Sequence, residues 1–343
     1  PLCQAVAHGC LSGRHQEALY KVYVDRILRG AGPGGFYSTK KLGAIGADLG
    51  AVACFFEEPW HRLAPSLAES DQAWLLNEAA FRLRALGRLQ EAVEPMRAGL
   101  QRDIAKRAWK ESAISASNLS ELELTLGAVD DAVRDAEQSV EFADRSDDAF
   151  QRMVCRTTLA DALHQAGRRE EALERFREAE AMQAEQQPQY PLLYSLQGFR
   201  YCDLLLADAE RAAAGGVGSE VGRVEEVVEG VREVEQRAQK FFEWRVPNDS
   251  ALDIALDHLT LGRVRLYRAL LDGSSVDAAE DAIEQAVDGL RRAGQNDETP
   301  KGFLTRAWLR AAQGKTDAVR TNLDEGEEIA LRGPMPLHLA DIH

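Results

Sequence analysis

Cysteine and histidine residues cluster near the start of the chain, where they could bind a metal. Cys3, His8, Cys10 and His15 carry thiol and imidazole donors of the kind that zinc prefers. Structural zinc sites usually take their ligands in pairs about two to five residues apart across a turn, and this spacing differs. We therefore expect buried thiols and surface imidazoles here, with no metal site.

A second set of residues has the types needed for nucleophilic catalysis. Asp161 and His164 lie three residues apart, and Cys155 lies two helical turns before them. A thiolate mechanism also needs a group that stabilises an oxyanion, and no pattern around these residues provides one. The sequence therefore predicts no enzyme in this chain, so that any catalytic domain would lie outside it.

Gly30, Gly32 and Gly35 match the glycine spacing of a dinucleotide-binding loop. That loop needs a β-strand before it and a helix directly after it, whereas a helical pattern over 20–28 precedes these glycines. A phosphate-binding P-loop is excluded because Phe36 and Tyr37 stand where lysine and serine or threonine are required. We interpret the tract as a loop between helices and expect no cofactor.

The elements that position these residues follow from an internal repeat. Gly87, Gly127 and Gly167 lie 40 residues apart. Each glycine lies between two apolar helical patterns, and a similar turn-and-helix sequence begins at Gly13. Glycine can adopt the left-handed conformation that ends a helix. The alanine five positions later (Ala92, Ala132 and Ala172) lets two helix axes approach to about 8–10 Å.

This spacing resembles the tetratricopeptide repeat (TPR), which implies an all-α right-handed superhelix of helical hairpins. Small and apolar residues stand at the positions that the family uses: Ala80, Leu83, Met96, Ala160, Leu163, Phe176, Ala179, Tyr194, Gly198 and Tyr201. Ser120 and Glu123 depart from the pattern, and the period exceeds the usual 34 residues. We expect hairpins over 2–29, 38–69, 71–106, 108–145, 147–186, 190–245, 249–294 and 299–332, and a further helix from 336.

The repeats divide into two stretches. Residues 1–214 carry the TPR-like pattern, and 215–343 carry irregular helical repeats that continue the same solenoid, with a glycine-rich loop at 215–218 between them. The chain begins at Pro1 and stops soon after the helix from 336 begins, which predicts a fragment of a longer chain.

Several stretches are also similar to one bacterial family of repeat arrays. They are 36–44, 81–89, 117–122, 190–206, 252–262 and 333–341. In that family the array resembles the C-terminal sensor region of STAND-type (NACHT-like) signalling NTPases, some of them linked to antiphage defence. The resemblance implies a ligand-sensing arm whose partners include NTPase and effector domains of the same longer chain.

The concave face of such a superhelix is where a protein or peptide ligand is expected to bind. First helices line this face, and asparagine there can bond to a peptide backbone as both donor and acceptor. Arg84 could hold a ligand carboxylate. Alternatively, this face is merely solvated, with Phe81, Phe199 and Trp308 partly in the core. The candidate ligand-binding residues are Trp74, Asn77, Phe81, Arg84, Asn118, Glu121, Thr158, Asp161, His164, Gln165, Phe199, Asp203 and Trp308.

Composition limits the partners. With 41 Lys and Arg against 56 Asp and Glu, the formal charge of −15 repels phosphate backbones, so we expect no nucleic acid. The chain has no apolar run long enough for a membrane span, and its five scattered cysteines suit a reducing cytoplasm. A free-standing TPR scaffold or adaptor, or the regulatory array of a protease, remains the alternative to a sensor arm.

Overall fold

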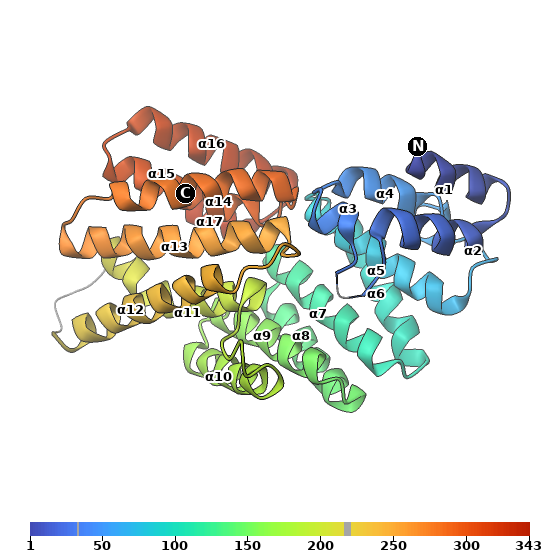
Figure 1. The fold of residues 1–343 in the computed structure, drawn as a ribbon, viewed down its shortest axis with the longest axis horizontal. Coiled ribbons are helices and arrows are strands. Elements are labelled where there is room, and N and C mark those ends of the chain that lie inside the picture. The colour runs from blue at the N-terminus through green and yellow to red at the C-terminus, as the bar shows by residue number, and fades with distance from the viewer. Residues whose placement is uncertain (33, 216–220) are drawn as a thin grey trace.

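The computed structural model describes residues 1–343 except 33 and 216–220, and it is an all-α array of helical hairpins (Figure 1). From residue 69 onward, successive long helices pair in the order of the chain. Their bounds are α5 (Glu69–Ala85), α6 (Leu89–Ala105), α7 (Trp109–Thr125), α8 (Val129–Ser146), α9 (Ala149–Gln165), α10 (Arg169–Gln186), α11 (Ser195–Ala213), α12 (Val221–Glu243), α13 (Ala251–Asp272), α14 (Asp277–Ala293), α15 (Thr299–Ala312), α16 (Thr316–Arg332) and α17 (Pro336–Ile342).

The repeated glycines end the first helix of each hairpin, as the sequence predicts. Gly87, Gly127 and Gly167 all have a φ of +75°, in the left-handed region that side chains with a Cβ rarely adopt. Ala92 and Ala172 are fully buried where the second helix crosses the first. The TPR-like hairpin is therefore confirmed at the residues that predict it.

The first 68 residues are less regular than expected. α1 (Leu2–Leu11) and α2 (His15–Glu17) are followed by a π-helix, η1 (Ala18–Leu28), and the hairpin expected over 38–69 is wrong. In its place the structure has α3 (Tyr37–Lys40), α4 (Ile45–Ala53) and an antiparallel ribbon of β1 (Phe56–Glu58) and β2 (Arg62–Leu63). Pro59 and a left-handed Trp60 (φ +67°) form the turn of this ribbon, a backbone path that no helix can follow.

The array curves until its later helices meet its earlier ones. The Asn296 N–H, after α14, donates to the Ala85 carbonyl at the end of α5 at 2.6 Å. Met335 and Ala330 are buried in the same apolar core as Leu89 and Met96 of α6. Near the centre of the molecule, the end of α14 lies beside α3 (Figure 1). The superhelix is thus closed on itself around its concave side.

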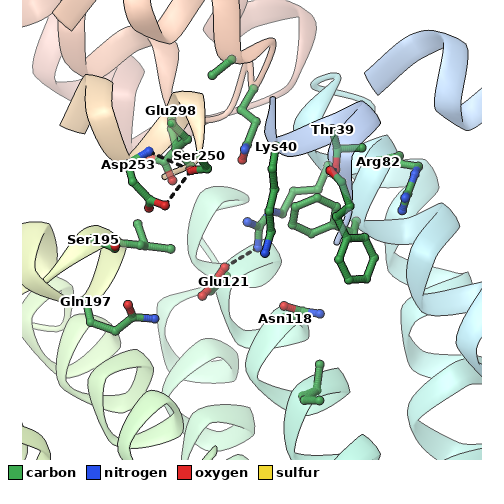
Figure 2. A pocket seen from close by; sticks show the side chains of 18 of the residues that line it. Thr39, Lys40, Arg82, Asn118, Glu121, Ser195, Gln197, Ser250, Asp253 and Glu298 are labelled. Atoms are coloured by element: carbon green, nitrogen blue, oxygen red, sulfur yellow. Dashed lines mark hydrogen bonds and ion pairs between the residues drawn. The ribbon is translucent and has the colours of Figure 1, made fainter. Parts of the chain in front are cut away.

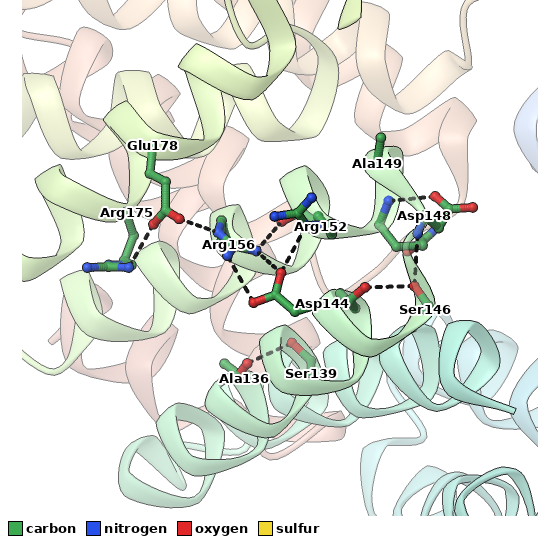
Figure 3. A network of polar contacts seen from close by, with 12 residues as sticks. Ala136, Ser139, Asp144, Ser146, Asp148, Ala149, Arg152, Arg156, Arg175 and Glu178 are labelled. Atoms are coloured by element: carbon green, nitrogen blue, oxygen red, sulfur yellow. Dashed lines mark hydrogen bonds and ion pairs between the residues drawn. The ribbon is translucent and has the colours of Figure 1, made fainter. Parts of the chain in front are cut away.

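Ion pairs join neighbouring hairpins, and the buried Arg156 on α9 provides the clearest case (Figure 3). Its guanidinium donates to both carboxylate oxygens of Asp144 on α8, at 2.9 and 3.0 Å, and to Glu178 on α10 at 2.6 Å. One side chain therefore fixes the relative positions of three consecutive helices.

The division of the chain near residue 215 stays a prediction, because most of the glycine-rich loop at 215–218 lies outside the described residues. α11 ends before that gap and α12 begins after it, and α13 packs against both of these helices. Among the helices of the described ranges, none is long and apolar enough to cross a membrane.

Candidate functional site

The inner helices enclose a cavity of about 470 Å³ on the concave side (Figure 2). Its wall combines carboxamides, hydroxyls, charged groups and apolar side chains that come from both the earlier and the later helices. The lining includes Phe36, Lys40, Asn77, Phe81, Asn118, Glu121, Tyr194, Ser195, Leu196, Gln197, Ser250, Asp253 and Glu298.

Two asparagines lie at adjacent repeat positions on the first helices of two successive hairpins. Asn77 on α5 and Asn118 on α7 are both half-buried, and the Asn118 amide donates to the Asn77 carbonyl oxygen at 3.3 Å. A carboxamide has two donors and one acceptor oxygen, so this single bond leaves both groups with capacity for a ligand. The TPR-like repeat is what brings them together.

A chain of buried ion pairs lies along the same wall. Arg84 bonds to Glu121 at 2.6 Å and to Asp297 at 3.0 Å, which joins α5, α7 and the segment before α15. Glu121 also pairs with Arg200 of α11 at 2.7 Å. Burial alone would raise the pKa of Glu121, but Arg200 and Arg84 hold it at about 2. The sequence predicts that Arg84 binds a ligand carboxylate. The structure corrects this prediction, because the carboxylates of Glu121 and Asp297 already pair with its guanidinium.

The network continues along the inner face through residues that the sequence singles out. Asp161 forms an ion pair with Arg200 at 3.1 Å, and Asp203 bonds to Arg263 of α13. His164 lies 3.8 Å from Asp203, and the Thr158 hydroxyl shares a hydrogen bond of 2.9 Å with Ser117. These four side chains form a polar layer that connects α7, α9, α11 and α13.

A second buried charge cluster supports the wall near Phe81. Arg82 is 1% exposed and bonds to Asp48 of α4 and, at 2.7 Å, to Glu78. Asp48 also accepts from the hydroxyls of Tyr23 and Ser38, at 2.9 and 2.8 Å. Four elements of the first half of the chain therefore meet at one carboxylate, which fixes this side of the cavity.

Eight of the predicted ligand-binding residues do not line the cavity: besides Thr158, Asp161, His164 and Asp203 of the polar layer, they are Trp74, Gln165, Phe199 and Trp308. Trp74 packs against Tyr23 with ring centroids 6.2 Å apart, and Trp308 against Tyr267 at 5.1 Å. Phe199 is only 4% exposed, in the core of α11, α13 and α14, and Gln165 is exposed at the end of α9. For Phe199 and Trp308 the structure agrees with the alternative expectation of a core position. Of the predicted set, Asn77, Phe81, Arg84, Asn118 and Glu121 line the cavity.

Sequence reasoning missed the opposite side of the cavity. Phe36 and Lys40 come from the irregular start of the chain, and Ser250, Asp253 and Glu298 come from the later helices that close the superhelix. No periodic pattern marks these residues, because they reach the cavity only through contacts between distant parts of the chain. One such contact joins Lys41, whose ammonium donates to the Pro247 carbonyl at 2.7 Å.

The residues considered for metal binding and catalysis have other surroundings. Burial raises the pKa of the Cys10 thiol to about 12 and that of the Cys155 thiol to about 11. His8 is exposed. Within the described ranges, no three His, Cys, Asp or Glu side chains come together as a metal site would require.

Comparison with known proteins identifies the fold. No protein-family model matches the sequence, and no curated protein matches it. Among solved structures, a Rap protein complexed with Competence and Sporulation Factor aligns with a TM-score of 0.56 and 10% identity, covering 85% of this chain and 72% of that one. A Rap conjugation gene regulator of the plasmid pLS20, in complex with the Phr* peptide, aligns with a TM-score of 0.49 and 15% identity, covering 83% and 71%. The chain is thus a TPR-like helical-repeat protein similar in fold to a Rap protein.

Proposed function

We propose that this TPR-like chain binds a short peptide in its concave cavity and acts as a peptide-responsive regulator of other proteins. The observation that carries the proposal is the lining of the cavity. Asn77, Asn118 and Gln197 present carboxamides to a space of about 470 Å³, which lies within the ~300–1,000 Å³ of typical ligand sites.

The chemistry of the wall suits a peptide in extended conformation. Carboxamides can bond to backbone N–H and C=O groups of any sequence, which gives affinity without a strict sequence demand. Phe36, Phe81 and Leu196 add apolar surface that can hold side chains of the ligand. Because Arg84 is already paired, recognition rests on these neutral groups and on the charged side chains of Lys40 and Asp253, which also line the cavity.

The comparisons add support for a regulator. The similar structure is that of a Rap protein with a bound factor, and the alignment extends over most of that chain. The expectation of a sensor arm within a STAND-type NTPase finds no counterpart among these structures. We therefore favour the alternative, a regulator or adaptor, over the arm and its NTPase and effector partners.

Selection from a library of random peptides tests the proposal. The wild-type chain should enrich a defined set of peptides, and Asn77→Ala with Asn118→Ala should weaken their binding roughly tenfold, since each lost hydrogen bond is worth about 0.5–1.5 kcal/mol. Gln101→Ala, at an exposed position on α6, is the matched control and should bind as the wild type does. Enrichment of no peptide, or binding that the double variant leaves unchanged, would contradict the proposal.

A further inference from the structure

A second, smaller cavity adjoins the first. It measures about 130 Å³ and lies between the connection of α10 and α11, the end of α12 and the first turns of α13. Tyr194, Ser195 and Asp253 line both cavities. This space uses none of the residues on which the proposed peptide contacts depend, apart from Asp253.

Three aromatic rings form one side of this small cavity. Tyr190 and Trp244 have ring centroids 5.4 Å apart, and Tyr194 lies 6.1 Å from Tyr190 and 6.4 Å from Trp244. All three side chains are half-buried, so parts of their rings face the space rather than the core. The Tyr194 hydroxyl donates to Gln187 at 3.1 Å, which holds its ring in place. Aromatic faces carry partial negative charge and attract cations.

Carboxylates form the other side. Asp249, Asp253 and Asp257 line the cavity, on the loop before α13 and on successive turns of that helix. Asp253 accepts from the Ser250 hydroxyl at 2.7 Å and Asp249 from the Val246 N–H at 2.9 Å. In the described part of the chain, no Lys, Arg or His nitrogen lies within 4.0 Å of either carboxylate.

A basic residue nearby does not fill the site. Arg245 lies 3.5 Å from Asp257, but its guanidinium stacks on the Phe242 ring at 3.9 Å and donates to the Ile254 carbonyl. Phe242 is not part of the cavity lining. Arg245 is therefore drawn toward Phe242, and the Lys41 ammonium donates to the Asp249 backbone carbonyl, so that neither cation pairs with the Asp253 carboxylate.

We propose that this cavity binds an alkylated ammonium group, with the methylated nitrogen against Tyr190, Tyr194 and Trp244 and its charge balanced by Asp253 and Asp249. Aromatic ring faces are only weak acceptors for N–H groups, so a cation without N–H donors loses little when it leaves water to lie against them. A quaternary ammonium is also more easily desolvated than a primary one. The group could belong to a free amine or to a trimethyllysine side chain of a peptide that lies in the adjoining cavity.

Titration with choline, followed by calorimetry on the whole chain, tests the site directly. We expect saturable binding that Trp244→Leu and Asp253→Asn each weaken roughly tenfold or more, as expected for a desolvated cation–π contact and its counter-charge. The neutral carbon isostere of choline, 3,3-dimethyl-1-butanol, should not compete. Trp60→Leu, in the turn of the β-ribbon, is the matched tryptophan control and should bind choline as the wild type does.

Circular dichroism melts verify that each variant is folded, and Asp253→Asn alone decides the matter if Trp244→Leu does not fold. A trimethyllysine tripeptide that binds more tightly than choline would assign the group to a peptide, and the reverse order would assign it to a free amine. Absence of saturable choline binding, equal binding of the neutral isostere, or unchanged binding by the folded variants would overturn the proposal. Because the probe is a free amine, this result is independent of whether the chain binds peptides.

Discussion

At the scale of single residues, the concave wall depends on charges removed from water. Arg84 was expected at the inner face, and it lies there, but Glu121 and Asp297 surround its guanidinium. The repeat register could predict its position. Its partner Asp297 could not be predicted, because that residue comes from a distant segment that contacts α5 only after the superhelix has closed.

Replacing Arg84 tests the importance of this network. Arg84→Met leaves Glu121 and Asp297 buried with less compensating charge, so the free energy of unfolding should fall by about 3–5 kcal/mol. Urea denaturation at pH 7 measures the loss. Adding Glu121→Gln should recover part of it, and a loss below about 1 kcal/mol would show that the network contributes little.

Asp103 provides a pH-dependent test. It is 7% exposed on α6 and accepts from the Ser115 hydroxyl on α7 at 3.1 Å. Burial raises the pKa of this carboxyl from 3.8 to about 6. The folded protein therefore holds a proton that the unfolded chain releases between pH 4 and 6, so stability falls as the pH rises through that window.

Asp103→Asn removes this titration. Its free energy of unfolding should change less between pH 4 and 6 than that of the wild type, by about 2 kcal/mol, because one pKa unit corresponds to about 1.4 kcal/mol. Urea denaturation at a series of pH values measures the difference. Identical pH profiles for the two proteins would contradict the assignment to Asp103.

At the scale of elements, the sequence predicts the helices well where the repeat is regular. From residue 69 to 186 the six observed helices differ from the expected hairpins by only a few residues at their ends. The prediction fails over 38–69, where Pro59 and the left-handed Trp60 form the turn of a short β-ribbon. The π-helical geometry of η1 was also missed, since an apolar pattern does not distinguish it from an α-helix.

The helix crossing within a hairpin can be tested with one pair of alanines. Ala172→Leu places a large side chain where α10 crosses α9 at a fully buried position, so the free energy of unfolding should fall by about 1–3 kcal/mol. Ala181→Leu, on an exposed position of the same helix, is the control and should change stability little. Thermal melts compare the two variants, and equal melting temperatures would place the crossing elsewhere.

At the scale of the whole molecule, the candidate site exists only because the superhelix closes. The sequence could predict the side formed by Asn77, Phe81 and Asn118, since these residues lie on the first helices of regular repeats. It could not predict Lys40, Ser250 or Glu298, because nothing local indicates which distant hairpins meet. Periodicity describes contacts between neighbouring repeats, and half of this cavity is made by other contacts.

Met335 tests the closure itself. It is fully buried before α17, within the core of α5 to α8. Met335→Ala should lower the free energy of unfolding by about 2–5 kcal/mol, as buried methionine truncations do. Leu331→Ala, at a residue 61% exposed, is the control. Urea denaturation compares the two, and a similar small effect for both would mean that α17 contributes little to the closed form.

The hydrogen bond from the Asn296 side chain to the Leu86 carbonyl spans 210 residues of sequence. An open solenoid can fray from either tip, one repeat at a time, because every unit depends only on its neighbours. A ring has no such tips to begin from. We therefore anticipate a slow, late folding event when the later helices join the earlier ones. We also anticipate that protection from hydrogen exchange is lost in one concerted step across the hairpins when these helices separate.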